Sequence, residues 1–403
     1  MSLLILTVGT GTAGRHSSLA DGLRNTISLL QPRLFWLVPS ESPDSLAIAD
    51  LVREGFDSFQ PWAEGVPYRA IARHDSLADC RDTVRGVIAV ARRHLREGES
   101  LLLNPTSGTK QMSAGATVAA LDESLGEIVF TVGDRSEGVV VTGTERIERF
   151  DASDYHAARD AGIARELAAA GNPLAAADLF SRHPALSGDA AVARCLHEWS
   201  RLNYEGARKI AAQSPDPRLI AVRGHLQTLA LALRPNSEPS LLVASDLLQN
   251  AEALVACGDC ETAFFHTCKA LEIALRNALW QNTQLLEPFR LKDLLALTSR
   301  KELQDRYRAT ALADGTCRLG LRQVAELLGS LNDPLCDALF RERAFDFVSI
   351  RNELAHAIRP VSMKEAASFI SLVQRLFRDR LPTCPPRPDL FTKVPVERDV
   401  PAR

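Results

Sequence analysis

The sequence has few lysines and no excess of positive charge. Of its 403 residues, 7 are lysine and 40 are arginine, and the formal net charge is −3. Residues 1–150 carry 15 basic and 19 acidic side chains, and residues 241–403 carry 22 and 21. A protein that coats nucleic acid with a broadly basic surface is therefore excluded, and any contact with RNA has to be confined to a local cleft.

Long apolar runs are also lacking, since none approaches the roughly 18 residues of a membrane helix. The first residues, 1–6, have neither the basic segment nor the cleavage site of a secretion signal, and they are typical of a buried strand. Apolar residues make up 46% and charged residues 24% of the chain, as in globular proteins with real cores. We expect a cytoplasmic protein of two or three domains, with no membrane partner.

Only two of the eight cysteines, Cys257 and Cys260, have a spacing that metal or redox sites use. A zinc site of this type would need a second such pair, which the sequence does not contain. A redox Cys-x-x-Cys is the other functional alternative, but the pair lies in a helical pattern and does not follow a strand. We therefore predict no metal site, and interpret the cysteines as buried free thiols in a reducing compartment.

Short apolar runs alternate with amphipathic stretches in the first 150 residues. This alternation predicts a doubly wound α/β domain with a mostly parallel sheet, which is Rossmann-like. A hairpin over residues 139–150 is expected to close the domain. The predicted strands are Leu3–Val8, Leu34–Val38, Pro67–Ala72, Ser100–Leu103 and Ile128–Val132, and the clearest helical stretches are Leu77–Leu95 and Ser113–Leu121.

Strand signals stop near residue 155, and alanine- and leucine-rich helical patterns take over. The proline-containing stretch 234–239 is the clearest linker, and Cys257-Gly258-Asp259 marks a further break. We predict a Rossmann-like domain over residues 1–152, an all-α connecting domain over 153–239, an all-α bundle over 240–385, and a flexible proline-rich tail over 386–403.

A glycine-rich loop directly follows the first strand. Gly9, Gly11 and Gly14 have the spacing G-x-G-x-x-G, which lets the backbone approach a phosphate at a helix N-terminus. This motif by itself also fits a nicotinamide-dependent oxidoreductase, with Glu41 as the residue that would hold the ribose. That alternative requires a catalytic residue and a substrate domain near the sheet, whereas the rest of the sequence is helical.

A second loop suited to anions follows the strand that ends near residue 103. Residues 104–112, Asn-Pro-Thr-Ser-Gly-Thr-Lys-Gln-Met, offer hydroxyls, a glycine, backbone N–H groups at a helix start and one lysine. That residue, Lys110, is the only lysine among the first 150 residues. In a parallel sheet both loops lie at the carboxyl edge, so we predict one shared site. A helix cap without any ligand is the alternative.

Together the two loops resemble those of the CARF domain, the CRISPR-associated Rossmann-like sensor of cyclic oligoadenylates. Residues 40–42, Ser-Glu-Ser, after the second strand are also similar to that family. The resemblance covers residues 1 to about 150, and implies a homodimer that binds one adenylate ring across its interface as activator, with no other cofactor. Similar proteins often use cyclic tetra-adenylate, which is the ring favoured here. The implied ligand-binding residues are Gly9, Thr10, Gly11, Thr12, Ser40, Thr106, Ser107, Gly108, Thr109 and Lys110.

The sharpest motif of the C-terminal third is residues 351–356, Arg-Asn-Glu-Leu-Ala-His. It lies in a predicted helix that Pro360 ends, so His356 falls in the last turn, where the helix dipole favours imidazolium. Metal-free RNA cleavage needs proton transfer and stabilisation of the phosphorane charge. His356 and Arg351, oriented by Asn352, supply these chemistries. An arginine and a histidine that merely cap a helix are the alternative.

The motif also resembles the R-x(4–6)-H motif of HEPN ribonucleases, whose common form has Asn after Arg. That family implies a helical bundle, a composite cleft shared by two protomers and a single-stranded RNA substrate. CARF followed by HEPN is the architecture of accessory ribonucleases of type III CRISPR systems. The stretch 155–236, with Trp199-Ser-Arg-Leu-Asn-Tyr204, is similar to the middle part of one branch. A signalling protein with an inactive HEPN cleft remains an alternative, and the first domain could also degrade its own ligand.

Overall fold

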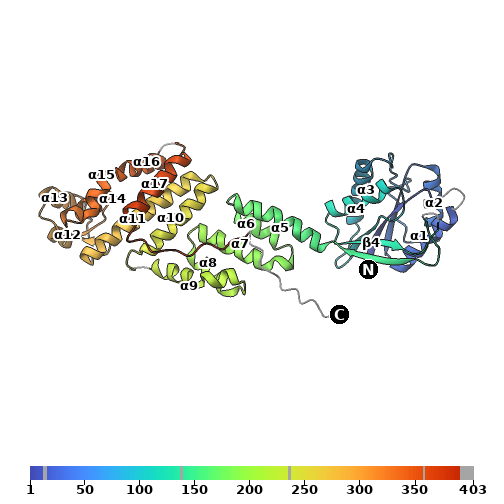
Figure 1. Cartoon of the computed structure of the whole chain (residues 1–403), viewed down its shortest axis with the longest axis horizontal. Coiled ribbons are helices and arrows are strands. Elements are labelled where there is room, and N and C mark those ends of the chain that lie inside the picture. Colours follow the sequence, from blue (N-terminus) through green and yellow to red (C-terminus); the bar gives the residue numbers. More distant parts are fainter. Residues whose placement is uncertain (12–15, 137–138, 235–236, 357–358, 391–403) are drawn as a thin grey trace. The chain divides into compact units, whose positions relative to one another are not determined.

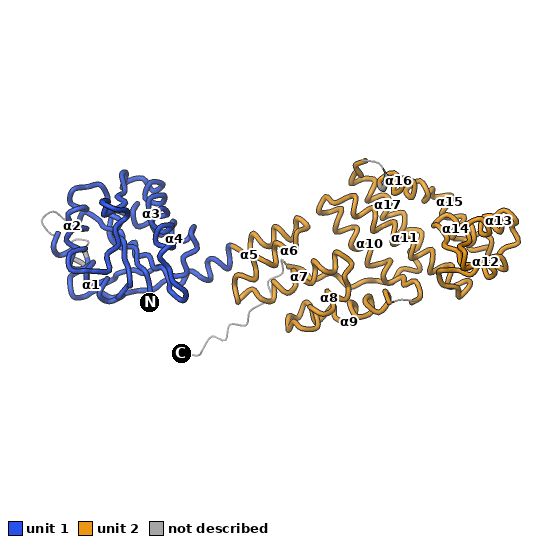
Figure 2. Tube along the Cα trace, turned by 180° about the vertical axis from the view of Figure 1, so that it is seen from behind, with its two compact units in different colours: residues 1–159 blue, residues 160–403 orange. Residues whose placement is uncertain are grey.

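The computed structural model describes residues 1–11, 16–136, 139–234, 237–356 and 359–390, without the side chains of residues 135, 136, 139, 355 and 356. It divides into two compact units, residues 1–159 and 160–403 (Figure 2). Over the described ranges, no helix combines the length and apolar character needed to cross a bilayer.

The first unit is built on a five-stranded sheet in the order β2-β1-β3-β4-β7. Strands β1 to β4 are parallel and β7 is antiparallel to β4. Its elements are β1 (Ser2–Val8), α1 (His16–Leu30), β2 (Leu34–Pro39), α2 (Pro43–Arg53), α3 (Leu77–Arg92), β3 (Ser100–Asn104), α4 (Lys110–Asp122), β4 (Glu127–Val132), β5 (Arg135–Ser136), β6 (Val139–Val140) and β7 (Arg146–Asp151), followed by α5 (Ser153–Ala169).

Helices cover both faces of this sheet (Figure 1). Leu3 and Ile5 of β1 pack with α3 and α4, whereas Leu4 and Leu6 pack on the other face with α1 and α2. Strands that are buried on both faces carry continuous apolar runs, and these runs allow β1 to β4 to be predicted from the sequence. The predicted doubly wound α/β domain is confirmed.

Two local predictions in this unit are wrong. Residues 67–72 form no strand: Ile71 makes a single bridge to Ser40, and Pro67 has no N–H group with which to extend a ladder. Residues 139–150 form no hairpin either. Strand β6 pairs with β5, while β7 pairs with β4 over its whole length, because the open edge of β4 offers six partners.

The second unit is mainly helical, as predicted, but in its described residues β8 and β9 form a short strand pair that the sequence did not predict. Its apolar core is continuous from Ala161 to Leu390. Helices α10, α11 and α17 pack together at its centre (Figure 1). Besides the end of α5, its elements are α6 (Pro173–Phe180), the 3₁₀ helix η1 (Pro184–Leu186), α7 (Ser187–Ser200), α8 (Tyr204–Gln213), α9 (Pro217–Ala232), α10 (Leu241–Ala256), α11 (Cys260–Thr283), β8 (Phe289–Arg290), α12 (Leu291–Leu297), α13 (Lys301–Thr310), β9 (Thr316–Cys317), α14 (Leu321–Ser330), α15 (Pro334–Arg341), α16 (Ala344–His356) and α17 (Met363–Leu376).

Residues 382–390 form an extended segment that packs against these helices. Ser245 Oγ donates a hydrogen bond to the Pro382 carbonyl at 2.6 Å, and Arg165 Nε donates to the Leu390 carbonyl at 2.9 Å. Leu390 is buried in the core. The sequence predicts a flexible tail from residue 386 onwards. Residues 386–390 are instead packed, and residues 391–403 lie outside the described residues.

All eight cysteines are free thiols, and six of them are buried. Cys384 is partly buried, and Cys257 is exposed at the start of the Cys-x-x-Cys stretch. The expectation that the cysteines are buried is therefore wrong for Cys257, which lies in the turn between α10 and α11.

We predict that Gly115→Ala destabilises the first unit. A Cβ atom at Gly115 would lie 2.7 Å from Cys80 Cβ and 2.9 Å from Arg81 N, so α3 and α4 would have to separate. Overpacking of this kind lowers the free energy of unfolding by about 1–3 kcal/mol. This loss outweighs the roughly 1 kcal/mol by which alanine stabilises a helix relative to glycine. Gly224→Ala in α9 is the control, because its added Cβ would meet no described atom beyond the neighbouring residues of its own helix within 4 Å. Urea unfolding of both variants measures the difference, and a Gly115→Ala protein as stable as its parent would contradict the close contact.

Candidate functional site

The loops that follow β1 and β3 touch each other at the carboxyl edge of the sheet. The Gly9 amide donates a hydrogen bond to Ser107 Oγ at 3.0 Å. A Cβ atom on Gly9 would lie 2.7 Å from both the Cα and the N atom of Gly108, so a side chain at Gly9 would push the loops apart. The structure thus brings together two of the loops from which a ligand site was predicted.

Ser40, at the end of β2, is held beside the β1 loop but faces inward. Its amide donates to Ser45 Oγ at 3.0 Å, and Ser45 Oγ donates to the Val8 carbonyl at 2.7 Å. Ser40 is 1% exposed, and its hydroxyl has no hydrogen-bond partner in the described part of the chain. A ligand at the surface does not reach this hydroxyl in the conformation described.

Two of the predicted threonines have structural hydrogen bonds. Thr106 Oγ1 accepts from the amide of Thr131 in β4 at 2.9 Å. Thr109 caps α4, because its Oγ1 accepts from the Met112 amide at 3.1 Å and donates to the His74 carbonyl at 2.8 Å. The Thr109 hydroxyl therefore caps α4, which is the structural part of the helix-cap alternative.

The groups left for an anion are those at the loop surface. Thr10 and Ser107 are half-buried, Gly108 and Lys110 are exposed, and Lys110 is the first residue of α4. Among the described residues, Lys110 makes no ion pair. A lysine and backbone N–H groups at a helix start together favour a negatively charged ligand. Gly11 is exposed with φ +67°. Thr12 and Gly14 lie outside the described residues.

The second predicted site lies on α16, in which His356 is the last residue before positions 357 and 358, which lie outside the described residues. Arg351 and Asn352 are exposed, and Arg351 Nη1 donates to Asn352 Oδ1 at 3.2 Å. The helix packs against the core through Phe347 and Leu354, which lie on neighbouring turns close to the side of Arg351. The side chain of His356 is outside the described residues, so the structure gives its helix position alone.

The chain restarts after α16 with a capping box, also as predicted. Ser362 Oγ accepts from the Glu365 amide at 3.2 Å, and Glu365 Oε2 accepts from the Ser362 amide at 2.9 Å. The Ser362 amide and hydroxyl, which both donate to Glu365 Oε2, lower the pKa of the Glu365 carboxyl. Arg359 pairs with Glu365 at 2.7 Å and with Glu353 at 3.3 Å. Arg359 is thereby held by two carboxylates, whereas Arg351 contacts the neutral amide of Asn352.

Arg351 and Asn352 line a cavity of about 540 Å³ between α11, α14 and α16. Four of its lining residues are basic and one is acidic. Lys269 and Arg322 are mostly exposed, although each lies near a glutamate of its own helix. The remaining lining residues are Phe265, Cys268, Glu272, Arg276, Leu319, Gly320, Leu321, Gln323 and Val348.

Sequence reasoning missed the cavity residues of α11 and α14. On α11, Lys269, Glu272 and Arg276 follow at i, i+3 and i+7 and so share one face, but this pattern is also typical of a solvated helix. Arg276 is engaged by Glu272 at 3.0 Å, which suits it to a structural role. Burial raises the pKa of the Cys268 thiol to about 12, so this cavity residue is a neutral thiol and no nucleophile near pH 7.

A scan against protein-family models and a search of curated proteins give no match. Among solved structures, Csm6 of Enterococcus italicus bound to cyclic hexa-2′-fluoro-hexa-dAMP is similar to this chain with a TM-score of 0.54. The likeness covers 94% of this chain and 95% of that one, at 14% sequence identity. The predicted order, a CARF-like α/β domain followed by HEPN-like helices, is confirmed as a fold. The chain has the fold of Csm6 over nearly its whole length.

Proposed function

We propose that this protein is a cyclic oligoadenylate-activated endoribonuclease that cleaves single-stranded RNA without a metal ion, in type III CRISPR antiviral defence. The observation that carries the proposal is the fold likeness to Csm6, whose solved structure holds a cyclic hexa-adenylate analogue. In this proposal residues 1–152 are the sensor, residues 153–239 connect, and residues 240–385 form the ribonuclease.

The sheet edge of the first unit supports the sensor role. The β1 and β3 loops meet at Gly9 and Gly108, where Gly108 is exposed and Ser107 half-buried, with the exposed Lys110 nearby in sequence. The net charge of the unit is negative, so a polyanionic ring needs such a local site. A ring with internal symmetry is best bound by two copies of the same loops, which supports a homodimer.

The ring size is open to direct measurement. The sequence resemblance favours cyclic tetra-adenylate, whereas the structural neighbour holds a six-membered analogue. Both rings belong to one chemical class, and the same loops serve either. We propose the class as the activator, with the tetra- and hexa-adenylates as the first two rings to compare.

The cavity beside α16 supports the ribonuclease role. Its basic lining suits a phosphodiester backbone, and the Arg351 guanidinium can stabilise charge on a phosphorane. His356 lies on the same helix, shortly before Pro360, and near a helix C-terminus the dipole favours a proton donor. An arginine, an asparagine and a histidine within six residues of one helix supply the acid–base and electrostatic parts of RNA cleavage.

Two other functions compete with this proposal. A signalling protein with an inactive HEPN-like cleft has the same fold, and an RNase assay with and without activator separates it from the proposed enzyme. A nicotinamide-dependent oxidoreductase uses the glycine loop alone. The fold likeness favours the sensor over that alternative, and the absorbance of the purified protein tests for a bound dinucleotide.

Lys110→Ala is expected to weaken activator binding by about tenfold to a hundredfold, the effect of losing one charge-assisted contact of about 1.5–3 kcal/mol. Calorimetric titration with cyclic tetra- and hexa-adenylate measures the affinity. RNA cleavage at saturating activator should survive the substitution. Lys301→Ala is the matched control, because Lys301 is also an exposed lysine at the first position of a helix, α13. An unchanged affinity in Lys110→Ala would place the ligand elsewhere.

Mixing intact protomers with His356→Ala protomers is expected to depress activity more than dilution does. If the two motifs of a dimer form one cleft, an equal random mixture of intact and His356→Ala protomers retains about a quarter of the activity of the same amount of intact protein. If each protomer has an independent site, the mixture retains about half. Co-expression of two differently tagged chains followed by an RNase assay gives the number. Mixing with Arg341→Ala protomers, whose exposed arginine lies outside the cavity, should cause no loss. A linear dependence on the intact fraction would argue for independent sites.

His356→Ala and Arg351→Ala are expected to reduce activator-stimulated RNA cleavage by about 10²–10⁴-fold, since each removes a proton-transfer or charge-stabilising group. Asn352→Ala should reduce the cleavage rate less, because Asn352 orients the catalytic side chains and transfers no proton. Arg351 is exposed, so its truncation opens no core cavity and activator binding should persist. Cleavage rates and titrations on each variant, with Arg341→Ala as control, measure these effects.

The same assay tests the chemistry. The 2′-hydroxyl is the expected nucleophile, so RNA with a 2′-deoxy sugar at the cleavage position should resist. The products should carry 2′,3′-cyclic phosphate and 5′-hydroxyl ends, and a chelator should not slow the reaction. Cleavage of the deoxy substrate, or a requirement for added Mg²⁺, would point to a metal-dependent nuclease.

A further inference from the structure

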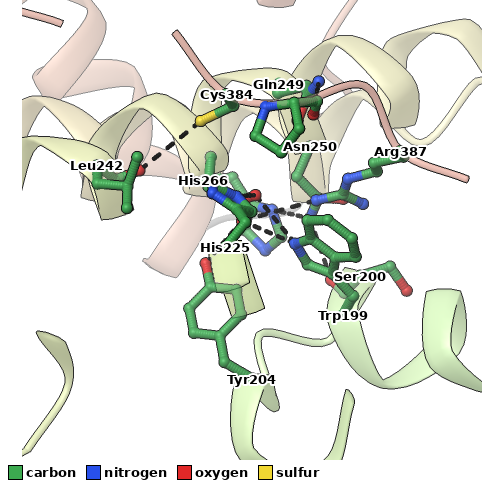
Figure 3. Close-up of polar contacts among 12 residues, drawn as sticks. Trp199, Ser200, Tyr204, His225, Leu242, Gln249, Asn250, His266, Cys384 and Arg387 are labelled. Carbon is green, nitrogen blue, oxygen red and sulfur yellow. Dashed lines mark hydrogen bonds and ion pairs between the residues drawn. The ribbon is translucent and has the colours of Figure 1, made fainter. Parts of the chain in front are cut away.

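The polar interior of the helical unit is centred on the carboxylate of Asp246, which has no exposed surface. Trp199 Nε1 donates to its Oδ1 at 2.9 Å, and Tyr204 Oη donates to its Oδ2 at 2.9 Å (Figure 3). Burial and the nearby carboxylate raise the pKa of Tyr204, so its hydroxyl remains a donor. These two donors fix the carboxylate in the way that outer-shell partners orient metal-binding carboxylates.

His225 of α9 brings a nitrogen to the same place. Its side chain is 9% exposed, and Nε2 lies 3.5 Å from Asp246 Oδ1. This nitrogen is buried and has no hydrogen-bond partner among the described residues. A buried polar atom without a partner calls for an explanation, such as a bound ion. The separation of 3.5 Å is close to the edge of about 3.4 Å of a tetrahedron with metal–ligand bonds of about 2.1 Å.

Cys384 brings a sulfur from the 382–390 segment. Its Sγ and the donor atoms of His225 and Asp246 all lie within 4.8 Å of one another. Sγ is otherwise engaged by a weak 4.0 Å contact with the Leu242 carbonyl (Figure 3). A sulfur–nitrogen edge in a tetrahedral zinc site is about 3.6 Å. A side-chain rotation of Cys384 with a shift of about 1 Å therefore suffices to bring the three atoms to ligand spacing.

We propose that His225, Asp246 and Cys384 bind a zinc ion that fastens the 382–390 segment to helices α9 and α10. Among the described residues these three form the one group of histidine, cysteine and acidic side chains with such spacing. Imidazole nitrogen and thiolate sulfur suit Zn²⁺, whereas Mg²⁺ and Ca²⁺ need a shell of oxygen atoms that this cluster does not provide. A water molecule would complete four ligands.

The charges of the cluster allow a divalent ion. Arg387 Nη2 lies 3.7 Å from Asp246 Oδ2. Its positive charge repels any other cation that binds to the Asp246 carboxylate. The Cys384 thiol loses its proton to solvent when its sulfur binds the metal, so thiolate and carboxylate together offset the charge of Zn²⁺. Arg387 keeps its own contacts, a 2.6 Å hydrogen bond to Asn250 Oδ1 and a position 5.0 Å over the Trp199 ring.

A proton on His225 is the competing occupant of this position. Burial by itself lowers the pKa of His225, but the contacts with Asp246 and Cys384 raise it to about 9. The resulting imidazolium would offset the Asp246 charge without any metal. A protonated His225 needs no thiolate at Cys384, whereas a bound zinc ion does. The state of the Cys384 sulfur therefore distinguishes the two arrangements.

The test is metal loading of the full-length protein with Zn²⁺ or Co²⁺, followed by desalting and elemental analysis. We expect one ion per chain and, with Co²⁺, a thiolate-to-cobalt charge-transfer band. Cys384→Ser should lose the band and bind zinc at least tenfold more weakly. Hydrogen exchange of the 382–390 amides should slow on zinc addition in the parent protein, but not in Cys384→Ser.

Cys257→Ser is the matched control, because it removes an exposed thiol from the Cys-x-x-Cys stretch and should retain both the ion and the band. Loss of the band in this variant, its persistence in Cys384→Ser, or the absence of bound metal in the parent protein would each overturn the proposal. Far-UV circular dichroism verifies that both variants are folded. The chelator experiment on RNA cleavage should be repeated with Cys384→Ser, where a chelator cannot act through this site.

Discussion

Strand β1 lies between two parallel neighbours, β2 and β3, and parallel pairing makes all three strands leave the sheet at the same edge. Three loops that are distant in sequence therefore meet there. The backbones of the β1 and β3 loops approach closely at Gly9 and Gly108 because Gly9 carries no Cβ atom. The surface that is available to an anion in the first unit follows from strand order more than from any single side chain.

The helical unit depends on a different constraint, the burial of charge. Asp246 has no exposed surface, and a carboxylate in that position is stable only if hydrogen bonds and cations replace the water that it loses. Trp199 and Tyr204 supply hydrogen bonds, and Arg387 supplies a positive charge. Asp246 lies on α10, which packs against α11. Side chains of α11 also line the cavity beside Arg351.

Much of the fold could be predicted because its signals are local. Strands β1 to β4 are apolar runs, and the capping box at Ser362 is contained in four residues. The error at Pro67–Ala72 arose because a short apolar run does not show whether a neighbouring strand has a free edge for it. Lys269 and Arg322 lie on separate helices, and their shared cavity depends on how α11 and α14 pack. The hydrogen bonds from Trp199 and Tyr204 to Asp246 could not be predicted from the sequence, because Asp246 is more than forty positions away.

The 382–390 segment also has a consequence for how the chain matures during synthesis. Its contacts with α10 and with Arg165 span 137 and 225 residues, so they form only after residue 390 has emerged from the ribosome. Until then Asp246 lacks Arg387, and water has to solvate a carboxylate that is later enclosed. The first unit contains no such late partner in its described residues, because its sheet is complete once β7 has been made. A newly made chain therefore has a finished α/β unit before its helical unit is closed.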